Sequence, residues 1–153
     1  NEDTMQKFVA VLGLLCVPHV YAESIEGCYL VADEITSFSS EESEIQSTYV
    51  KISRSAGNYS VEGLIWGANF HVCHIASPIE GVGGPLQMNY GYKLVYSHSE
   101  AEYSINCELE VSFKDNSLTI KDSNHHCSEY VFYCGARVGL DNVELPKVAQ
   151  GCP

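Results

Sequence analysis

Two short stretches of the chain hold residue types that could bind a metal ion or form disulfides. Residues 67–75 read GANFHVCHI and residues 125–127 read HHC, so histidines and cysteines gather at two places far apart in the sequence. A structural zinc site usually takes four thiolate or imidazole ligands. His71 with Cys73, and His125 with Cys127, could supply such a set. The spacing matches no established zinc pattern, however, and the same sulfurs could form disulfides instead.

The compartment of the protein decides between these two interpretations. Lys7 is followed by an unbroken apolar run from Phe8 to Val17, and Val20-Tyr21-Ala22 resembles a cleavage site. This layout is typical of a secretory signal peptide, and the run is shorter than the ~20 apolar residues that span a membrane. The sequence therefore predicts added or upstream residues at 1–4, a signal peptide at 5–22 and a single mature domain at 23–153.

The cysteine count of the mature chain favours disulfides. Six cysteines remain after the leader, an even number, and an exported chain with an even number of cysteines is typically disulfide-bonded. Six cysteines allow 15 connectivities, of which we predict Cys73–Cys107, Cys127–Cys134 and Cys28–Cys152. Because export oxidises thiols, we favour disulfides with incidental histidines over a metal site, and we expect no metal or other cofactor.

The composition is strongly acidic. The chain has 153 residues, with 20 acidic and eight basic side chains and a formal net charge of −12. Without Glu2, Asp3 and Lys7 the mature chain keeps 18 acidic and seven basic residues, so its net charge is about −11. Such a balance argues against nucleic acid, whose phosphates require Lys and Arg, and against anionic membrane surfaces after signal cleavage. It fits a cationic partner, or simply solubility.

Alternation of apolar and polar residues indicates strands throughout the mature chain. A period of two marks a strand with one buried face, and two pairs of such runs are joined by turn residues, which indicates hairpins. The sequence predicts an all-β fold, a single-domain antiparallel β-barrel or sandwich of about seven to eight strands, reinforced by disulfides. The runs lie at residues 28–35, 49–53, 59–64, 70–75, 86–96, 105–113 and 118–120.

The segment Thr36–Thr48, TSFSSEESEIQST, has no periodicity and no basic residue. We predict a long exposed loop, which is either a solvated connection or a projection toward a partner, because binding segments concentrate on loops held by a rigid scaffold. In the second interpretation the contact residues are Glu41, Glu42 and Glu44, joined by Asp33 and Glu34 at the end of the preceding strand. The stretch His98–Tyr103 is the alternative contact face.

Signatures of catalysis are weak in this chain. It has no G-x-S-x-G, no H-E-x-x-H and no glycine-rich phosphate loop. Asp122, Ser123 and His125 include the residue types of a hydrolytic triad, but such types co-occur by chance. We therefore predict no catalytic residues and a protein that is not an enzyme. Arg137, a rare cation in this chain, is predicted to form a structural ion pair with Asp141, the alternative being ligand binding.

Several of these stretches together resemble small secreted proteobacterial β-proteins. The stretches are G-A-N-F-H-V-C at 67–73, G-G at 83–84, the cysteine of INCELEVSF, and C-x6-C-G-A-R at 127–137 with Asp141. In size, export signal, disulfides and acidity the chain is also similar to periplasmic lysozyme inhibitors and to immunity proteins against type VI secreted peptidoglycan hydrolases. It lacks the S-G-S-x-x-x-Y type of loop of known lysozyme inhibitors, so no inhibitory residue is carried over.

The resemblance and the charge lead to two expectations for function. The first is a periplasmic inhibitor or immunity protein that binds and blocks a cationic cell-wall hydrolase or secreted effector, with electrostatic steering toward the open cleft of the enzyme. The alternative is a secreted glycan- or small-ligand-binding β module. In that case Trp66, Tyr90, Tyr92 and Tyr96 would form an aromatic platform, although a β-core uses the same residue types. Either protein could act as a homodimer.

Overall fold

The protein folds as one continuous antiparallel β-sheet that curls on itself. The computed structural model describes residues 24–40, 42–77, 87–89 and 93–153. The predicted signal peptide, Glu41, the G-G pair at 83–84, Tyr90 and Tyr92 lie outside the described residues. The described strands are β1 (Gly27–Thr36), β2 (Ser43–Ser55), β3 (Asn58–Trp66), β4 (Val72–Ser77), β5 (Gln87–Asn89), β6 (Lys93–Glu100), β7 (Ile105–Lys114), β8 (Ser117–Lys121) and β9 (Val143–Val148).

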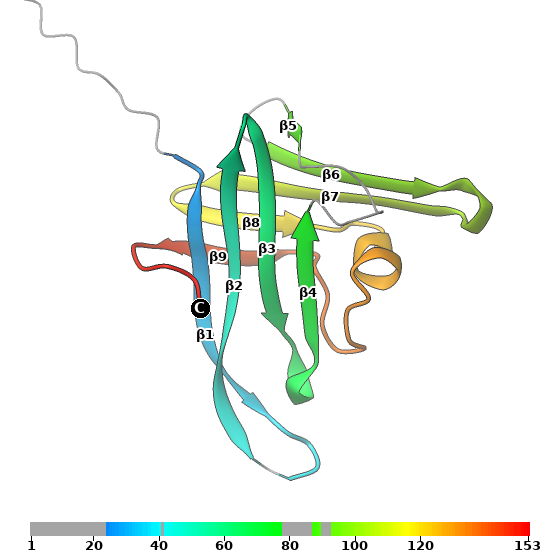
Figure 1. Ribbon diagram of the computed structural model, residues 1–153. Helices are drawn as coiled ribbons and strands as arrows, with labels where there is room; N and C mark the ends of the chain where they lie inside the picture. Colours follow the sequence, from blue (N-terminus) through cyan, green and yellow to red (C-terminus); the bar gives the residue numbers. More distant parts are fainter. Residues whose placement is uncertain (1–23, 41, 78–86, 90–92) are drawn as a thin grey trace, which may run out of the picture.

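The strand order is β4-β3-β2-β1-β9-β8-β7-β6-β5, and every pair of neighbours is antiparallel. Strands β1 and β9 pair at only two positions, Cys28 with Val148 and Tyr29 with Lys147. This short seam joins two halves whose strands cross steeply, with β1–β4 in one half and β6–β9 in the other (Figure 1). Since β5 also approaches β3, the sheet is nearly closed. The predicted all-β, barrel-like fold is confirmed.

The hydrophobic core lies between the two halves and follows the alternation of the strands. Leu109 and Val111 of β7 are fully buried, whereas Glu108 between Cys107 and Leu109 is exposed. The largest fully buried side chains come from both halves of the sheet and from the segment before β9. They include Tyr96, Ile52, Ile75, Leu94, Leu118, Ile120, Leu140 and Leu145. Burial of these side chains is the main favourable contribution to folding.

Two of the hairpins close with two-residue turns that their sequences predict. Ser55 pairs with Asn58, and the turn residues Ala56 and Gly57 have positive φ values of 49° and 86°. Likewise Lys114 pairs with Ser117 across Asp115 and Asn116, which have φ values of 50° and 61°. Positive φ at both central residues matches the twist of the flanking strands. Both hairpins predicted from the alternation are therefore confirmed.

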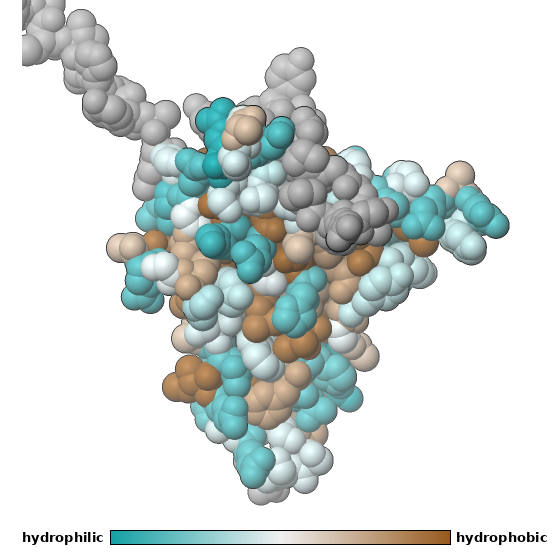
Figure 2. Space-filling view, in the orientation of Figure 1, coloured by the Kyte–Doolittle hydropathy of each residue, from teal (hydrophilic) through white to brown (hydrophobic). Residues whose placement is uncertain are grey.

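The prediction of a loop over Thr36–Thr48 is wrong for about half of the segment, because Thr36 belongs to β1 and residues 43–48 belong to β2. Strand β2 begins at Ser43 and pairs with β1 up to Thr36, so only Ser37–Glu42 connect the strands. The outer part of this hairpin projects beyond the rest of the sheet, at the lower end of the molecule in Figure 1. A hairpin without a core to cover buries neither face, which explains why its sequence shows no alternation. Figure 2 shows that this end mixes hydrophilic side chains with a few hydrophobic ones.

Three short helical turns complete the described fold. Two are 3-10 turns, η1 (Ala68–Phe70) between β3 and β4 and η2 (Ala101–Tyr103) between β6 and β7. The third, η3 (Cys127–Val131), is a π-helical turn after β8 that packs against β7. Within the described part of the chain, no helix has the length and apolar character needed to cross a membrane.

Candidate functional site

All six cysteines of the predicted mature domain form disulfides, but only one predicted pairing is correct. Cys28 pairs with Cys152 as expected, while the predicted pairs Cys73–Cys107 and Cys127–Cys134 are both wrong. The bonds are Cys73–Cys134 and Cys107–Cys127. The two predicted pairs have thus exchanged partners. The reason is the turn η3, which directs Cys127 toward Cys107 of β7 and leads the chain on until Cys134 lies beside Cys73 of β4. The Cα atoms of the two pairs are 4.2 and 4.6 Å apart.

The disulfide Cys73–Cys134 joins the two motifs that carry the sequence resemblance. The amide of Gly135 donates a hydrogen bond to the carbonyl oxygen of Val72, at 3.0 Å, so the C-G-A-R stretch lies along the start of β4. A Cβ atom at Gly135 would lie 2.9 Å from Nδ1 of His71. One at Gly67 would collide with the backbone oxygen of Arg137. Both glycines are thus explained by the close approach of these two segments.

The tip of the acidic hairpin rests on the joined motifs. The amide of Ser37 donates to the carbonyl oxygen of Glu42 at 2.8 Å, which closes the tip. The amide of Phe38 donates to Oδ1 of Asn69 at 3.0 Å, and the guanidinium carbon of Arg137 lies 4.9 Å from the centre of the Phe38 ring. A hydrogen bond and a cation–π contact therefore connect the tip to both motifs, so the hairpin is supported at both ends.

The ion pair predicted between Arg137 and Asp141 is wrong. Arg137 contacts Phe38, and among the described residues it forms no ion pair. Asp141 instead accepts hydrogen bonds from the amide of Asp122, at 3.1 Å, and from the side chain of Asn142, at 2.6 Å. Arg137 thus packs its guanidinium on the Phe38 ring, while Asp141 holds the loop after β8.

The predicted partner-binding carboxylates lie on both faces of the hairpin. Asp33 shares the β1 face of the buried Tyr29, whereas Glu34 points to the opposite face. Glu44 pairs with Ile35 and therefore lies on the face of Asp33, and its carboxylate accepts a hydrogen bond from Gln46 at 3.0 Å. All three, and Glu42 at the tip, are exposed. The structure thus brings the four described carboxylates onto one projecting element.

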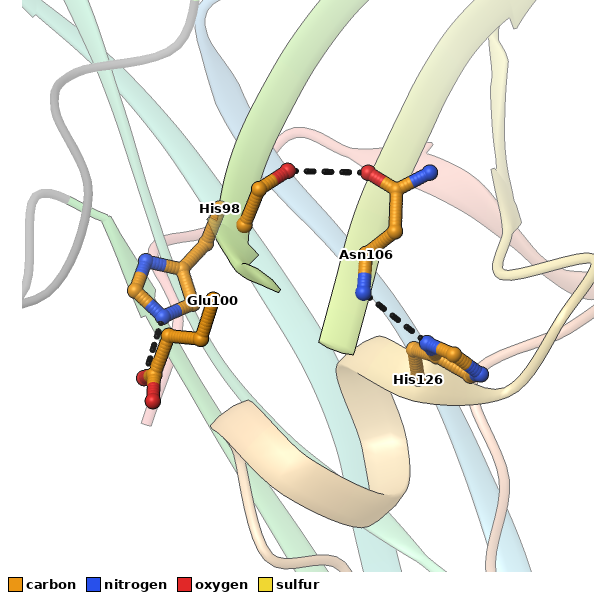
Figure 3. A network of polar contacts seen from close by, with 5 residues as sticks. His98, Glu100, Asn106 and His126 are labelled. Atoms are coloured by element: carbon orange, nitrogen blue, oxygen red, sulfur yellow. Dashed lines mark hydrogen bonds and ion pairs between the residues drawn. The ribbon is translucent and has the colours of Figure 1, made fainter. Parts of the chain in front are cut away.

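The candidate metal ligands have other roles in the structure. Cys73 and Cys127 are oxidised and belong to different disulfides. Among the described residues, no three His, Cys, Asp or Glu side chains are placed to hold a metal ion. Nδ1 of His126 accepts a hydrogen bond from the amide of Asn106, at 3.0 Å, in the polar network of Figure 3. His71 packs against Gly135.

The three triad residue types near η3 are not arranged as a triad. The carboxylate of Asp122 is fully buried and accepts hydrogen bonds from the amides of Cys127, at 3.1 Å, and Ser128, at 2.8 Å. Ser123 and His125 are exposed, and the amide of His125 donates to the carbonyl oxygen of Asp122 at 2.9 Å. The contacts of Asp122 are those of a residue that caps a turn, because a carboxylate satisfies amides that a helical turn leaves unpaired.

Two members of the predicted aromatic platform belong to the interior or its edge. Tyr96 is only 1% exposed and packs against Phe132, with the ring centres 5.6 Å apart. Burial raises the pKa of the Tyr96 hydroxyl above its usual value. Trp66 is half-buried and meets Phe70 edge-on at 6.3 Å. Among the described residues, the exposed aromatic side chains are Phe38, Tyr103, Tyr130 and Tyr133, which alternation could not reveal because they lie outside the strands.

Comparison of the chain with protein-family models, curated proteins and solved structures finds no match.

Proposed function

We propose that this protein is a secreted, periplasmic inhibitor or immunity protein whose acidic β1–β2 hairpin binds a cationic cell-wall hydrolase. The observation that carries the proposal is the hairpin itself, an ordered projection with carboxylates on both faces. The chain has no Lys or Arg from Leu30 to Val50, so no cation of the hairpin itself neutralises Asp33, Glu34, Glu42 and Glu44. The three disulfides and the predicted signal peptide support export to an oxidising compartment.

The shape of the hairpin suits an open enzyme cleft. Paired strands lie about 4.8 Å apart, so a two-stranded hairpin is narrow enough to enter a groove that accommodates a glycan chain. Asp33 and Glu44 would face one wall of such a groove, and Glu34 the other. Support of the tip through Phe38 and Asn69 lowers the conformational entropy lost on binding, which favours affinity.

Charge would act mainly on the rate of association. A projection of one sign attracts a cationic partner before contact and raises the association rate, and salt weakens this attraction. The Debye length is about 8 Å at physiological ionic strength. The proposal therefore predicts fast association at low salt and a steep decline as salt is added.

The test is association kinetics against a panel of cationic wall hydrolases, beginning with a C-type lysozyme, over a range of ionic strengths. The test variant neutralises the hairpin by Asp33→Asn, Glu34→Gln, Glu42→Gln and Glu44→Gln. A matched variant removes the same net charge from exposed carboxylates elsewhere, by Glu62→Gln, Glu108→Gln, Asp115→Asn and Glu144→Gln.

We expect the hairpin variant to associate at least about fivefold more slowly at low salt, and with a flatter salt dependence. The matched variant should stay close to the unmodified protein, because its charges lie away from the contact. Equal rates for both variants would remove the hairpin from the interface. Failure to bind any hydrolase of the panel would refute the inhibitor function altogether.

A further inference from the structure

Two exposed tyrosines border the turn η3, on a part of the molecule that the proposed inhibitor function does not use. Tyr130 lies within η3 and is 46% exposed, and Tyr133 follows the turn and is 80% exposed. Large aromatic side chains usually bury much of their surface. Two of them three residues apart, both open to solvent, therefore indicate a surface that another molecule covers.

The ring of Tyr130 contacts the imidazole ring of His126. His126 meets it edge-on, with ring centres 5.3 Å apart and an interplanar angle of 87°. His126 is itself fixed by the amide of Asn106, which donates to Nδ1, and by Asn124, whose Oδ1 accepts from the His126 amide at 3.2 Å. Ser99 of β6 in turn donates to Oδ1 of Asn106 at 2.9 Å (Figure 3). A chain of polar contacts through two strands thus orients an exposed ring.

The backbone of Tyr133 is held in an unfavourable conformation. Its φ of 49° lies in the left-handed region, which costs a non-glycine residue about 1 kcal/mol or more. The neighbours impose it, because Phe132 is buried in the core and Cys134 is bonded to β4. His125, just before η3, is also left-handed, with a φ of 61°. Strain of this kind concentrates at binding and catalytic sites.

A shallow depression of about 200 Å³ lies between η3 and the segment that follows it. Its polar side chains are His125, Ser128 and Glu129, and the backbone of Gly135 and Gly139 completes it. Tyr130 and Tyr133 each adjoin a lining residue in sequence. Two disulfides hold the two walls, Cys107–Cys127 on one side and Cys73–Cys134 on the other.

We propose that Tyr130 and Tyr133, together with the depression whose lining residues Glu129 and Cys134 adjoin them in sequence, bind one or two rings of a neutral oligosaccharide. A pyranose ring has an apolar C–H face that packs on an aromatic ring, and hydroxyls that hydrogen-bond to carboxylate, imidazole and backbone groups. No Lys or Arg lines the depression, which argues against an anionic ligand. The size of the depression suits one sugar ring, since drug-sized ligands need pockets of about 300 Å³ or more.

The tyrosines and lining residues of this site are not the hairpin carboxylates, so either proposal can fail alone, although Arg137, which contacts Phe38 at the hairpin tip, lies between the lining residues Ala136 and Val138. The glycan-binding alternative predicted from the sequence placed its platform on Trp66, Tyr90, Tyr92 and Tyr96. Of these, Trp66 and Tyr96 are among the described residues, and they are half-buried and buried. The sugar surface proposed here uses other residues.

The experiment is an NMR titration of the full, oxidised protein with tetra-N-acetylchitotetraose and, separately, with cellotetraose. We expect millimolar or tighter binding of at least one of them, with the largest shifts at the amides of residues 125–139. Tyr130→Ala and Tyr133→Ala should each weaken binding about fivefold or more. Ile45→Ala, which removes an exposed side chain of similar exposure (76%) from the hairpin, should leave it unchanged.

Unfolding curves of the variants provide the folding control, because loss of an exposed side chain changes stability by less than about 0.5 kcal/mol. Absence of shifts with both sugars at millimolar concentration would refute the site. So would binding that both tyrosine variants retain in full. Either result leaves the hydrolase test untouched, since that test depends on the hairpin carboxylates.

Discussion

Replacement of Asp122 by alanine tests whether one buried carboxylate holds η3 in place. The side chain of Asp122 is completely buried, and its two oxygens accept the amides of Cys127 and Ser128 at 3.1 and 2.8 Å. Both of these residues are themselves buried. Asp122→Ala would therefore remove two hydrogen bonds and leave two amide donors inside the protein without an acceptor.

The size of the effect follows from these two contacts. A hydrogen bond to a charged group contributes about 1.5–3 kcal/mol, and an unsatisfied buried donor costs about 1–3 kcal/mol. Since these figures describe overlapping losses, we expect Asp122→Ala to lower the free energy of unfolding by about 3–5 kcal/mol. This is a large part of the 5–15 kcal/mol that typical domains possess. Asp122→Asn keeps one acceptor oxygen but turns an NH₂ group toward the other amide. Its free energy of unfolding should therefore lie between those of the unmodified protein and Asp122→Ala.

The assay is equilibrium unfolding in urea with the disulfides intact, evaluated by linear extrapolation. Asp33→Ala is the matched control, because this carboxylate is exposed on the outer part of the β1–β2 hairpin and its backbone is not in the left-handed region. The control should stay within about 0.5 kcal/mol of the unmodified protein. A loss below about 1 kcal/mol for Asp122→Ala, at an unchanged urea slope, would refute the capping role.

Three further predictions concern the junction of the motifs, a disulfide and a buried hydroxyl. Gly67→Ala should lower the free energy of unfolding in urea by about 1–3 kcal/mol, because its Cβ meets the neighbouring segment. Gly139→Ala has open space and should be nearly neutral, so equal losses for the two variants would contradict the close approach at Gly67. Removal of Cys107–Cys127 with paired alanines should cost about 3 kcal/mol for its separation of 20 residues, and peptide mapping that found another partner for Cys107 would overturn the connectivity. Burial raises the pKa of Tyr96 above its usual value of 10.0. The buried, protonated hydroxyl therefore contributes fully to the free energy of unfolding below pH 10, and this contribution is lost as pH rises through the folded-state pKa. Tyr96→Phe should therefore lose less stability than the unmodified protein on going to alkaline pH, and parallel pH curves would contradict this.

The strands that cover the core could be read from the sequence. Where one face is buried and the other solvated, apolar residues recur at every second position, as in Ile105–Phe113, and this alternation predicts both the strand and its inward face. The turn residues Ala56-Gly57 and Asp115-Asn116 then specify which strands pair. Both hairpins followed from these local rules because all the relevant contacts lie close in sequence.

The acidic hairpin shows where such reasoning fails. Ser43–Thr48 form a strand although they have no alternation, since the outer hairpin covers no core. The carboxylates of Asp33, Glu34 and Glu44 are exposed, and their contact with a partner stays a prediction. Their division between two faces follows from the register with β1, and register is a property of the paired strands together.

The sequence by itself determined the fold class, the engagement of the six cysteines from Cys28 to Cys152 in disulfides and the acidic character of one segment. These depend on local alternation, on an even cysteine count and on composition. Only the tertiary structure decided which cysteines pair, that Arg137 packs on Phe38 rather than on Asp141, and that GANFHVC and CGAR form one surface. The physical reason is that each of these contacts joins residues far apart in the chain, whose distance depends on how η3 and the curled sheet place them and not on their neighbours in sequence.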